Sequence, residues 1–312
     1  MDRGDRVNVK VAEVRVAVIG VPNNSLGSPD GVARGPAALR RAGLLERLAA
    51  RADVVDYGDL RFAPPSTERD PRSGVMGLRS LVTMVQAVNG CVARALSEGR
   101  FPIVIGGDCP LVLGCLAAAR KVHGRVGLVF VDGHEDAWPP QQAPTGQAAD
   151  LELGFALGRH LGGLPKELAD LLPLVQPSDV AILGARNAGE LAEFGVASLR
   201  GEVEFYNDRE LRNGGIHDVA TRVVARLGDS VGVWWLHSDV DVLSQEALPT
   251  DFPQAGGFSW EEFGALTRAG ISGRGVVGWD ITVYNPDQDA GGKLANRLVN
   301  SIGAAFASRA PS

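Results

Sequence analysis

The sequence predicts an α/β fold with a mostly parallel, eight-stranded sheet and helices on both of its faces. Short β-branched apolar runs alternate with segments of helical periodicity along the 312 residues. Several of these runs are almost continuously apolar, which is typical of strands buried on both faces, as in a parallel sheet. Alternation of strand and helix along the whole chain indicates a doubly wound arrangement.

Eight segments have the composition of strands: 14–20, 53–57, 101–106, 126–132, 179–184, 203–206, 232–239 and 276–283. Helical spacing of apolar residues predicts helices over 36–49, 75–97, 110–122, 151–161, 216–227, 260–269 and 290–309. Pro36 suits the first turn of its helix, and Ser259 with Glu262 forms the pattern of a capping box. Segments 61–73 and 137–149, which are rich in proline and polar residues, are expected to be loops.

Composition favours a single domain over residues 1–312 and argues against several other classes of protein. The net charge is −6 and no basic patch stands out, so nucleic acid is not an expected partner. Residues 1–10 lack the apolar core of a signal peptide, and no apolar stretch reaches the roughly 18 residues of a membrane span. Three cysteines without a CxxC pair favour free thiols in a reducing cytoplasm.

Acidic residues follow two of the predicted strands at alternate positions. Asp132, His134 and Asp136 lie in VFVDGHEDAW, and Asp239 and Asp241 lie in WWLHSDVDVL. Residues two apart in an extended chain point the same way, so each motif directs its side chains to one place. Carboxylates this close repel one another unless a cation is bound between them. A solvated acidic loop explains either motif alone, but the two motifs together predict a metal site.

A third motif, Gly-Gly-Asp-Cys at 106–109, joins a predicted strand to a predicted helix. Glycines allow the backbone to approach a ligand closely or to adopt positive φ. Cys109 is then a metal ligand, a reactive thiol near a helix N-terminus, or a packed core residue, and packing is the simplest interpretation. His237 is either a partner of the metal ligands or a satisfied core histidine.

These motifs, in this order, resemble those of the ureohydrolase family, which includes arginase, agmatinase and formimidoylglutamase. Five motifs carry the resemblance. The family patterns are GGDH, DAHxD, SxDxDxxDP, a GG turn and E-[VI]-[NS]-P. In the same order, this chain has GGDC at 106–109, DGHED at 132–136, HSDVDVLSQ at 237–245, GGF at 256–258 and TVYNP at 282–286. The N-terminal strand, loop and first helix also resemble the family. The resemblance covers nearly the whole chain and implies a three-layer αβα, arginase-like domain.

The resemblance also implies a binuclear metal site, usually of manganese. The implied ligands are Cys109, Asp132, His134, Asp136, Asp239 and Asp241. Asp132 and Asp239 would bridge the two ions, and the other four residues would complete the two shells. In the family, a hydroxide between the ions attacks an amidino carbon. Asp136 would handle its proton, so Asp136 and His134 are the expected catalytic residues.

One metal ligand departs from the family pattern. Cys109 stands where the family has a histidine, and a thiolate favours Zn²⁺ or Fe²⁺ over Mn²⁺. The chain is therefore expected to bind two divalent ions, or one if Cys109 does not ligate. A single ion at His134 would resemble the sites of the related deacetylases.

The expected substrate-binding residues depart further. Val283 replaces the glutamate that pairs with the substrate's guanidinium, Ala149 stands at the family's loop histidine, and Trp138 replaces an asparagine that reads the α-carboxylate. Thr250 keeps a hydroxyl that the family also has. A valine cannot neutralise a buried cation, so hydrolysis of L-arginine is not expected.

Three other acidic residues are candidates to replace the lost groups. Asp150 or Glu152 could take over the proton transfer of the missing histidine. Glu135, beside the metal ligands, could replace the lost carboxylate, although a solvated loop residue is the favoured interpretation.

The sequence thus predicts a metal-dependent hydrolase that cleaves a non-peptide C–N bond of a small amidino or guanidino molecule through a metal-activated hydroxide. Two alternatives stay open. One is a non-catalytic subunit that pairs with an active homologue, and the other is a mononuclear, deacetylase-like amidohydrolase. The resemblance implies a homo-oligomer, a trimer or a hexamer.

Overall fold

The structure, a computed structural model, describes residues 14–309. Residues 1–10, on which the expectation of no signal peptide rests, and both ends of the predicted domain lie outside the described residues. Within 14–309, none of the helices combines the length and the apolar character that crossing a bilayer requires.

Eight strands form one sheet, as the sequence predicts. They are β1 (Arg15–Val21), β2 (Asp53–Asp59), β3 (Phe101–Gly106), β4 (Gly127–Val131), β5 (Val180–Gly184), β6 (Glu204–Asn207), β7 (Trp234–Asp239) and β8 (Val276–Thr282). Their order in the sheet is β2-β1-β3-β8-β7-β4-β5-β6, and every neighbouring pair is parallel. The sheet is therefore entirely parallel, where the sequence predicted a mostly parallel one.

The helices are α1 (Gly35–Arg41), α2 (Leu44–Ala49), α3 (Leu78–Ser97), α4 (Leu111–His123), α5 (Glu152–Ala156), α6 (Lys166–Ala169), α7 (Ala188–Glu193), α8 (Asp208–Gly214), α9 (Ile216–Ser230), α10 (Trp260–Ser272) and α11 (Lys293–Phe306). Ser259 and Glu262 form the predicted capping box at the start of α10. The predicted helix at 36–49 is wrong as one unit, because Gly43 with φ 86° separates α1 from α2.

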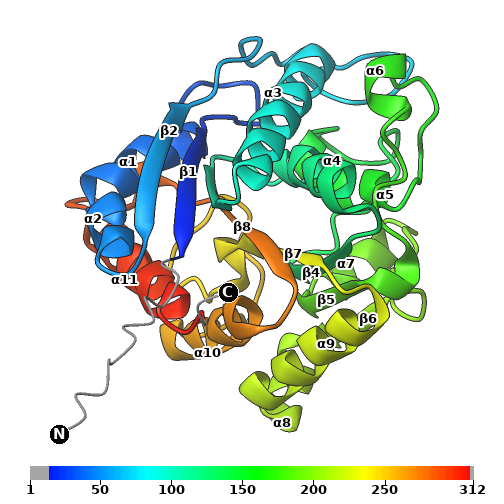
Figure 1. Ribbon diagram of the computed structural model, residues 1–312. Helices are drawn as coiled ribbons and strands as arrows, with labels where there is room; N and C mark the ends of the chain where they lie inside the picture. Colours follow the sequence, from blue (N-terminus) through cyan, green and yellow to red (C-terminus); the bar gives the residue numbers. More distant parts are fainter. Residues whose placement is uncertain (1–13, 310–312) are drawn as a thin grey trace, which may run out of the picture.

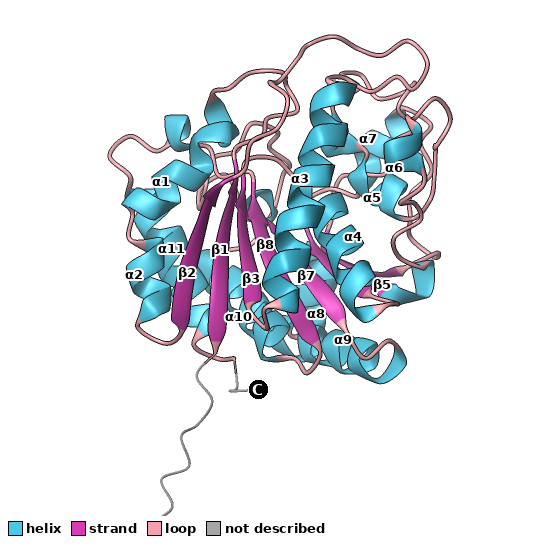
Figure 2. Cartoon of the chain, turned by 45° about the horizontal axis from the view of Figure 1, so that its top comes forward, coloured by secondary structure: helices cyan, strands magenta, loops and turns pink. Residues whose placement is uncertain are grey.

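Helices cover both faces of the sheet and make three layers (Figures 1 and 2). Val16 and Val18 of β1 point into a core beneath α1, α2, α8, α9, α10 and α11. Ala17 and Ile19, the alternate residues of the same strand, point into a second core beneath α3, α4 and α5. Burial on both faces explains why these strands read as continuous apolar runs.

The sheet order places four strand ends side by side. Strands β3, β8, β7 and β4 are neighbours at the centre of the sheet, although β3 and β4 are consecutive in the chain. In an open parallel sheet, ligands bind at the carboxyl ends of strands where the strand order reverses. The three acidic or cysteine-bearing motifs and Val283 follow these four strands, so the topology brings them to one edge.

Candidate metal centre

Asp132, His134 and Asp241 form one compact group at this edge. Asp132 follows the last residue of β4 and is fully buried. Its Oδ1 accepts a hydrogen bond from the backbone N–H of His134 at 2.7 Å. The imidazole Nδ1 of His134 lies 2.8 Å from Asp241 Oδ2 and 3.6 Å from Asp132 Oδ1. The predicted convergence of the two acidic motifs is present, with one ligand atom of each residue within 4.8 Å of the others.

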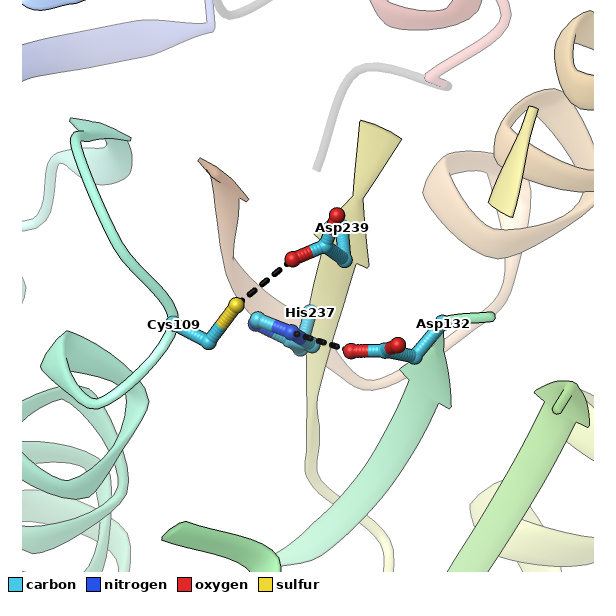
Figure 3. A group of neighbouring side chains, drawn as sticks. All are labelled: Cys109, Asp132, His237 and Asp239. Carbon is cyan, nitrogen blue, oxygen red and sulfur yellow. Dashed lines mark hydrogen bonds and ion pairs between the residues drawn. The ribbon is translucent and has the colours of Figure 1, made fainter. Parts of the chain in front are cut away.

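Asp239 lies beside this group and contacts Cys109 (Figure 3). It ends β7, and its Oδ1 accepts the backbone N–H of Asp241 at 2.7 Å. Its Oδ2 lies 2.5 Å from Cys109 Sγ and accepts a hydrogen bond from the Thr282 hydroxyl at 3.3 Å. Cys109 is therefore not confined to the apolar core, because its sulfur faces the carboxylates.

Asp136 completes the predicted set. It is buried and has φ 41°, in the left-handed region that residues other than glycine rarely adopt. Its backbone carbonyl accepts hydrogen bonds from Leu153 and Gly154, which hold the turn against α5. Asp136, Cys109, Asp132 and Glu152 place ligand atoms within 4.8 Å of one another.

The electrostatics of the cluster favour a bound cation. Burial raises the pKa of Asp136 and Asp239, and the neighbouring carboxylates raise both pKa values further. Burial also raises the pKa of the Cys109 thiol, and Asp239 adds to that effect. For Asp132, burial acts in the same direction, but the imidazoles of His134 and His237 outweigh it and lower its pKa. Imidazoles thus favour the charged form of Asp132, whereas burial and neighbouring carboxylates disfavour the charged forms of Asp136 and Asp239.

Buried atoms without partners point to the same conclusion. Four buried polar atoms of the cluster have no hydrogen-bond partner within residues 14–309. They are Asp132 Oδ2, both carboxylate oxygens of Glu152 and Nε2 of His237. Leaving such groups buried and unpaired is unfavourable, by about 1–3 kcal/mol each and more for charged groups. A divalent cation would satisfy them, so the donor set fits a metal.

A cavity of about 280 Å³ opens above the cluster. Cys109, His134, Asp136, Asp239 and Asp241 form part of its lining. Trp138, Ala149 and Val283 also line it, which makes one wall apolar. Thr250 lies outside this lining, and its hydroxyl accepts a hydrogen bond from Gln245 at 2.8 Å. A substrate contact by Thr250 stays a prediction.

Several polar residues of the cavity were not singled out as site residues from the sequence. Asn187 directly precedes α7, Glu190 lies in α7 and Asp251 lies in the loop before α10, and no spacing or motif marks them. Asp150 also lines the cavity, and burial raises its pKa to about 6. Glu135 is buried instead, and it accepts hydrogen bonds from Ser198 and from the backbone of Leu199. Its interpretation as a solvated loop residue is therefore wrong.

Gly107 of the Gly-Gly-Asp-Cys motif has no room for a side chain. A Cβ on this residue would lie 1.9 Å from the backbone oxygen of Asn23. Gly107→Ala is therefore expected to lower the free energy of unfolding by about 1–3 kcal/mol and to displace Cys109. Gly90→Ala on α3 is the matched control, since nothing lies within 4 Å of its Cβ, and it should be neutral or slightly stabilising. Urea unfolding of both variants measures the difference, and equal effects would contradict the prediction.

Comparison with known proteins identifies the family. Residues 14–306 match the family model described as "Arginase family". The chain is 27% identical over 296 residues to an arginase of Bacillus caldovelox, covering 93% of this chain and 97% of that protein. It is 28% identical to Arginase-1 of Homo sapiens over 291 residues, covering 92% and 89% of the two chains. The solved structure of the Bacillus caldovelox arginase superposes with a TM-score of 0.81, 25% identity and coverage of 94% and 98%. The chain belongs to the arginase family.

Proposed function

We propose that the chain is a metal-dependent hydrolase that cleaves a C–N bond in a small amidino or guanidino compound other than L-arginine. The observation that carries this proposal is that the six predicted ligand residues lie close together and that five of them, all but Asp132, line one cavity. Bound divalent cations would supply a nucleophilic water at neutral pH and stabilise the charge that develops on the substrate.

We assign different roles to the residues of the cluster. Asp132 and Asp239 would help to hold both ions, as the family resemblance implies. A ligand atom of Asp132 lies within 4.8 Å of ligand atoms of Cys109, His237 and Asp239, and one also lies within 4.8 Å of those of His134 and Asp241. Asp136 is assigned the proton transfer, because its buried carboxyl faces the cavity and burial raises its pKa, so it holds a proton readily. The buried backbone and side-chain contacts around these residues fix their positions before substrate enters.

The cavity favours a small cation with an apolar part. Asp150, Glu190 and Asp251 add acidic groups to its lining. Trp138 and Val283 occupy the positions at which the family pattern has the groups that read arginine, and here they form the apolar wall. Trp138 is held by an edge-to-face contact with Phe194, with ring centres 5.4 Å apart. These features favour guanidino or amidino compounds without an α-amino acid group.

Metal analysis and a substrate survey test the proposal together. Purified protein should hold up to two divalent ions per chain and hydrolyse at least one member of a panel of alkylguanidines, alkylamidines and amides. Chelation should stop the reaction, and added metal should restore it. One ion per chain with activity on amides would instead favour the mononuclear deacetylase-like enzyme. Protein that binds metal without any turnover, and that co-purifies with a homologous active chain, would favour the non-catalytic subunit.

Metal affinity is expected to rise with pH. Burial raises the pKa of Asp136, Asp239 and Cys109, so protons compete more strongly with a metal ion for each of these groups. Lowering the pH therefore increases competition from protons and weakens binding. Titration calorimetry with Zn²⁺ and with Mn²⁺ in buffers of different ionisation enthalpy, at about pH 6 and about pH 8, measures both affinity and proton release. Affinity that is independent of pH would contradict this prediction.

We further propose a homo-oligomer, a trimer or a hexamer, in a reducing cytoplasm. The three free cysteines support the reducing compartment, since Cys91, Cys109 and Cys115 form no disulfide. Light scattering on the purified protein measures the oligomeric state.

A further inference from the structure

His237 lies beneath the metal centre with one ring nitrogen directed at it (Figure 3). It is on β7, two residues before Asp239, so both side chains leave the strand on the same face. The ring is fully buried, and Nε2 has no hydrogen-bond partner among the described residues. Asp132 Oδ2 lies 3.6 Å from Nε2, which is within ion-pair distance but beyond hydrogen-bond range, and that oxygen also has no hydrogen-bond partner among the described residues.

The other side of the ring is fixed by its neighbours. Nδ1 lies 2.5 Å from Asp280 Oδ2, and Trp235 donates its indole N–H to Asp280 Oδ1 at 2.5 Å. Phe130 stacks on the imidazole with ring centres 4.6 Å apart. A carboxylate behind one ring nitrogen is the usual support of a metal-bound histidine, because it holds the proton on Nδ1 and leaves the Nε2 lone pair free. Nε2 is therefore prepared to bind a cation.

Glu152 is a second buried residue that reaches the cluster. It begins α5 and is fully buried, yet neither of its carboxylate oxygens has a hydrogen-bond partner within residues 14–309. A buried carboxylate without donors is costly unless a cation or a proton neutralises it. One of its oxygens lies within 4.8 Å of ligand atoms of Cys109, Asp132 and Asp136. Glu135, by contrast, is buried but accepts hydrogen bonds from the Ser198 hydroxyl and the Leu199 backbone N–H.

We propose that His237 and Glu152 are metal ligands, and that they rebuild the ion site at which this chain has Cys109 in place of the family's histidine. The inference rests on the proposed function, because it concerns the same metal centre. Ligand atoms of His237, Cys109, Asp132 and Asp239 lie within 4.8 Å of one another. Two ligands on opposite sides of one ion, at bonds of about 2.0–2.3 Å, lie up to about 4.6 Å apart, so a spread of at most 4.8 Å is close to that of a single site. Glu152 belongs to a second group of the same spread, with Cys109, Asp132 and Asp136, and the two groups share Cys109 and Asp132.

The donor set also predicts which ion binds. A thiolate with an imidazole and carboxylates selects Zn²⁺ or Fe²⁺, whereas Mn²⁺ prefers a shell of oxygen donors. The rebuilt site is therefore expected to bind Zn²⁺ more tightly than Mn²⁺. In the other group, Asp132, His134 and Asp241 contain no sulfur. The two ion positions should consequently differ in metal preference within one protein.

The test uses Glu152→Gln and His237→Gln, with Glu135→Gln as the matched control. Each protein is stripped with a chelator and titrated with Zn²⁺ against a chromophoric competitor, and bound metal is counted by mass spectrometry. Both test variants are expected to lose one ion, or to bind it at least about 100-fold more weakly, which exceeds the 10- to 100-fold effect of an outer-shell partner. Glu135→Gln should bind Zn²⁺ like the wild type.

Cobalt spectra and stability separate ligation from a structural role. Wild-type protein with Co²⁺ should show a thiolate-to-cobalt charge-transfer band, and both variants should change the visible spectrum of that ion. Without metal, Glu152→Gln should melt at or above the wild-type temperature, because it removes an unpaired buried charge. Cys109→His in the His237→Gln background should restore the lost ion by returning an imidazole to the site.

Three outcomes overturn the inference. If both variants bind two ions with wild-type affinity and spectra, His237 and Glu152 are not ligands, while the proposed function stands. If Glu152→Gln loses the same stability with and without Zn²⁺, its role is structural. If wild-type protein binds no divalent ion, the inference and the proposed function fail together.

Discussion

Asp239→Asn is expected to abolish metal binding and to reduce hydrolysis by roughly 10³-fold or more, since a metal supplies several kcal/mol of transition-state stabilisation. Asparagine keeps the shape of the side chain and the oxygen that accepts the Asp241 N–H. It loses the charge at the centre of the cluster, next to Cys109. Metal content by mass spectrometry and turnover on the best substrate of the panel measure the two effects.

The same substitution should not weaken the metal-free fold. Burial raises the pKa of Asp239, so its charged form is disfavoured in the folded state and a neutral asparagine avoids that penalty. With chelator at neutral pH, Asp239→Asn should melt at or above the wild-type temperature. A variant that retains metal, or that loses activity only because it unfolds, would contradict the assignment.

Asp289→Asn is the control, because Asp289 is also buried but lies away from the cavity. Burial acts to raise its pKa, but hydrogen bonds from the Tyr284 hydroxyl and the Ala295 N–H outweigh it and lower the pKa. A folded pKa below the unfolded one means that the ionised group stabilises the fold at neutral pH. That stability is lost as pH falls through the folded pKa. Asp289→Asn should therefore melt lower than wild type with its metal content unchanged.

The strands were predictable because parallel burial leaves a simple signal. The central strands are buried at almost every position, and β7, predicted over 232–239, is observed over Trp234–Asp239. Helix boundaries depend on backbone details that composition does not carry. The helix predicted at 151–161 ends at Ala156, and Gly158 with φ 81° and His160 with φ 55° then turn the chain away.

The site was predictable where its residues follow one another in a short motif and not where it depends on packing between elements. Asp239 and Asp241 were placed together from the sequence alone, although β7 ends at Asp239 and Asp241 lies in the 3₁₀ turn Val240–Val242. His237 was ambiguous because its role depends on register, which pairs it with Asp280 of β8 and leaves Nε2 free. The burial of Glu135 was not predicted either, because its hydrogen-bond partners, Ser198 and Leu199, are more than sixty residues away in the chain.

Val283 is an uncharged residue in the lining of the cavity, at the position where the family pattern has a glutamate. It has φ 68°, a conformation that is strained for a β-branched residue, and its N–H donates to the Gly107 carbonyl at 2.6 Å. Its side chain packs with Val32 and Cys109, and it lines the cavity together with this candidate metal ligand. A longer acidic side chain at this position would place a carboxylate in the cavity beside a bound guanidinium.

Val283→Glu is therefore expected to lower KM for alkylguanidines by about 10- to 100-fold, which corresponds to the roughly 1.5–3 kcal/mol of a charged hydrogen bond. Loss of the β-branch also relieves part of the backbone strain, so the variant should fold. KM for a neutral amide substrate should not improve.

Val283→Gln separates charge from shape, because glutamine has the same length without the charge. If it improves alkylguanidine binding as much as Val283→Glu does, the gain comes from relieved strain or added contacts. The prediction would then be wrong. Metal content must be measured in parallel, because a glutamate beside Cys109 can also approach the ions. Unchanged metal stoichiometry with a lower KM for cations alone would establish that the valine at this position is what withholds the counter-charge from a guanidinium substrate.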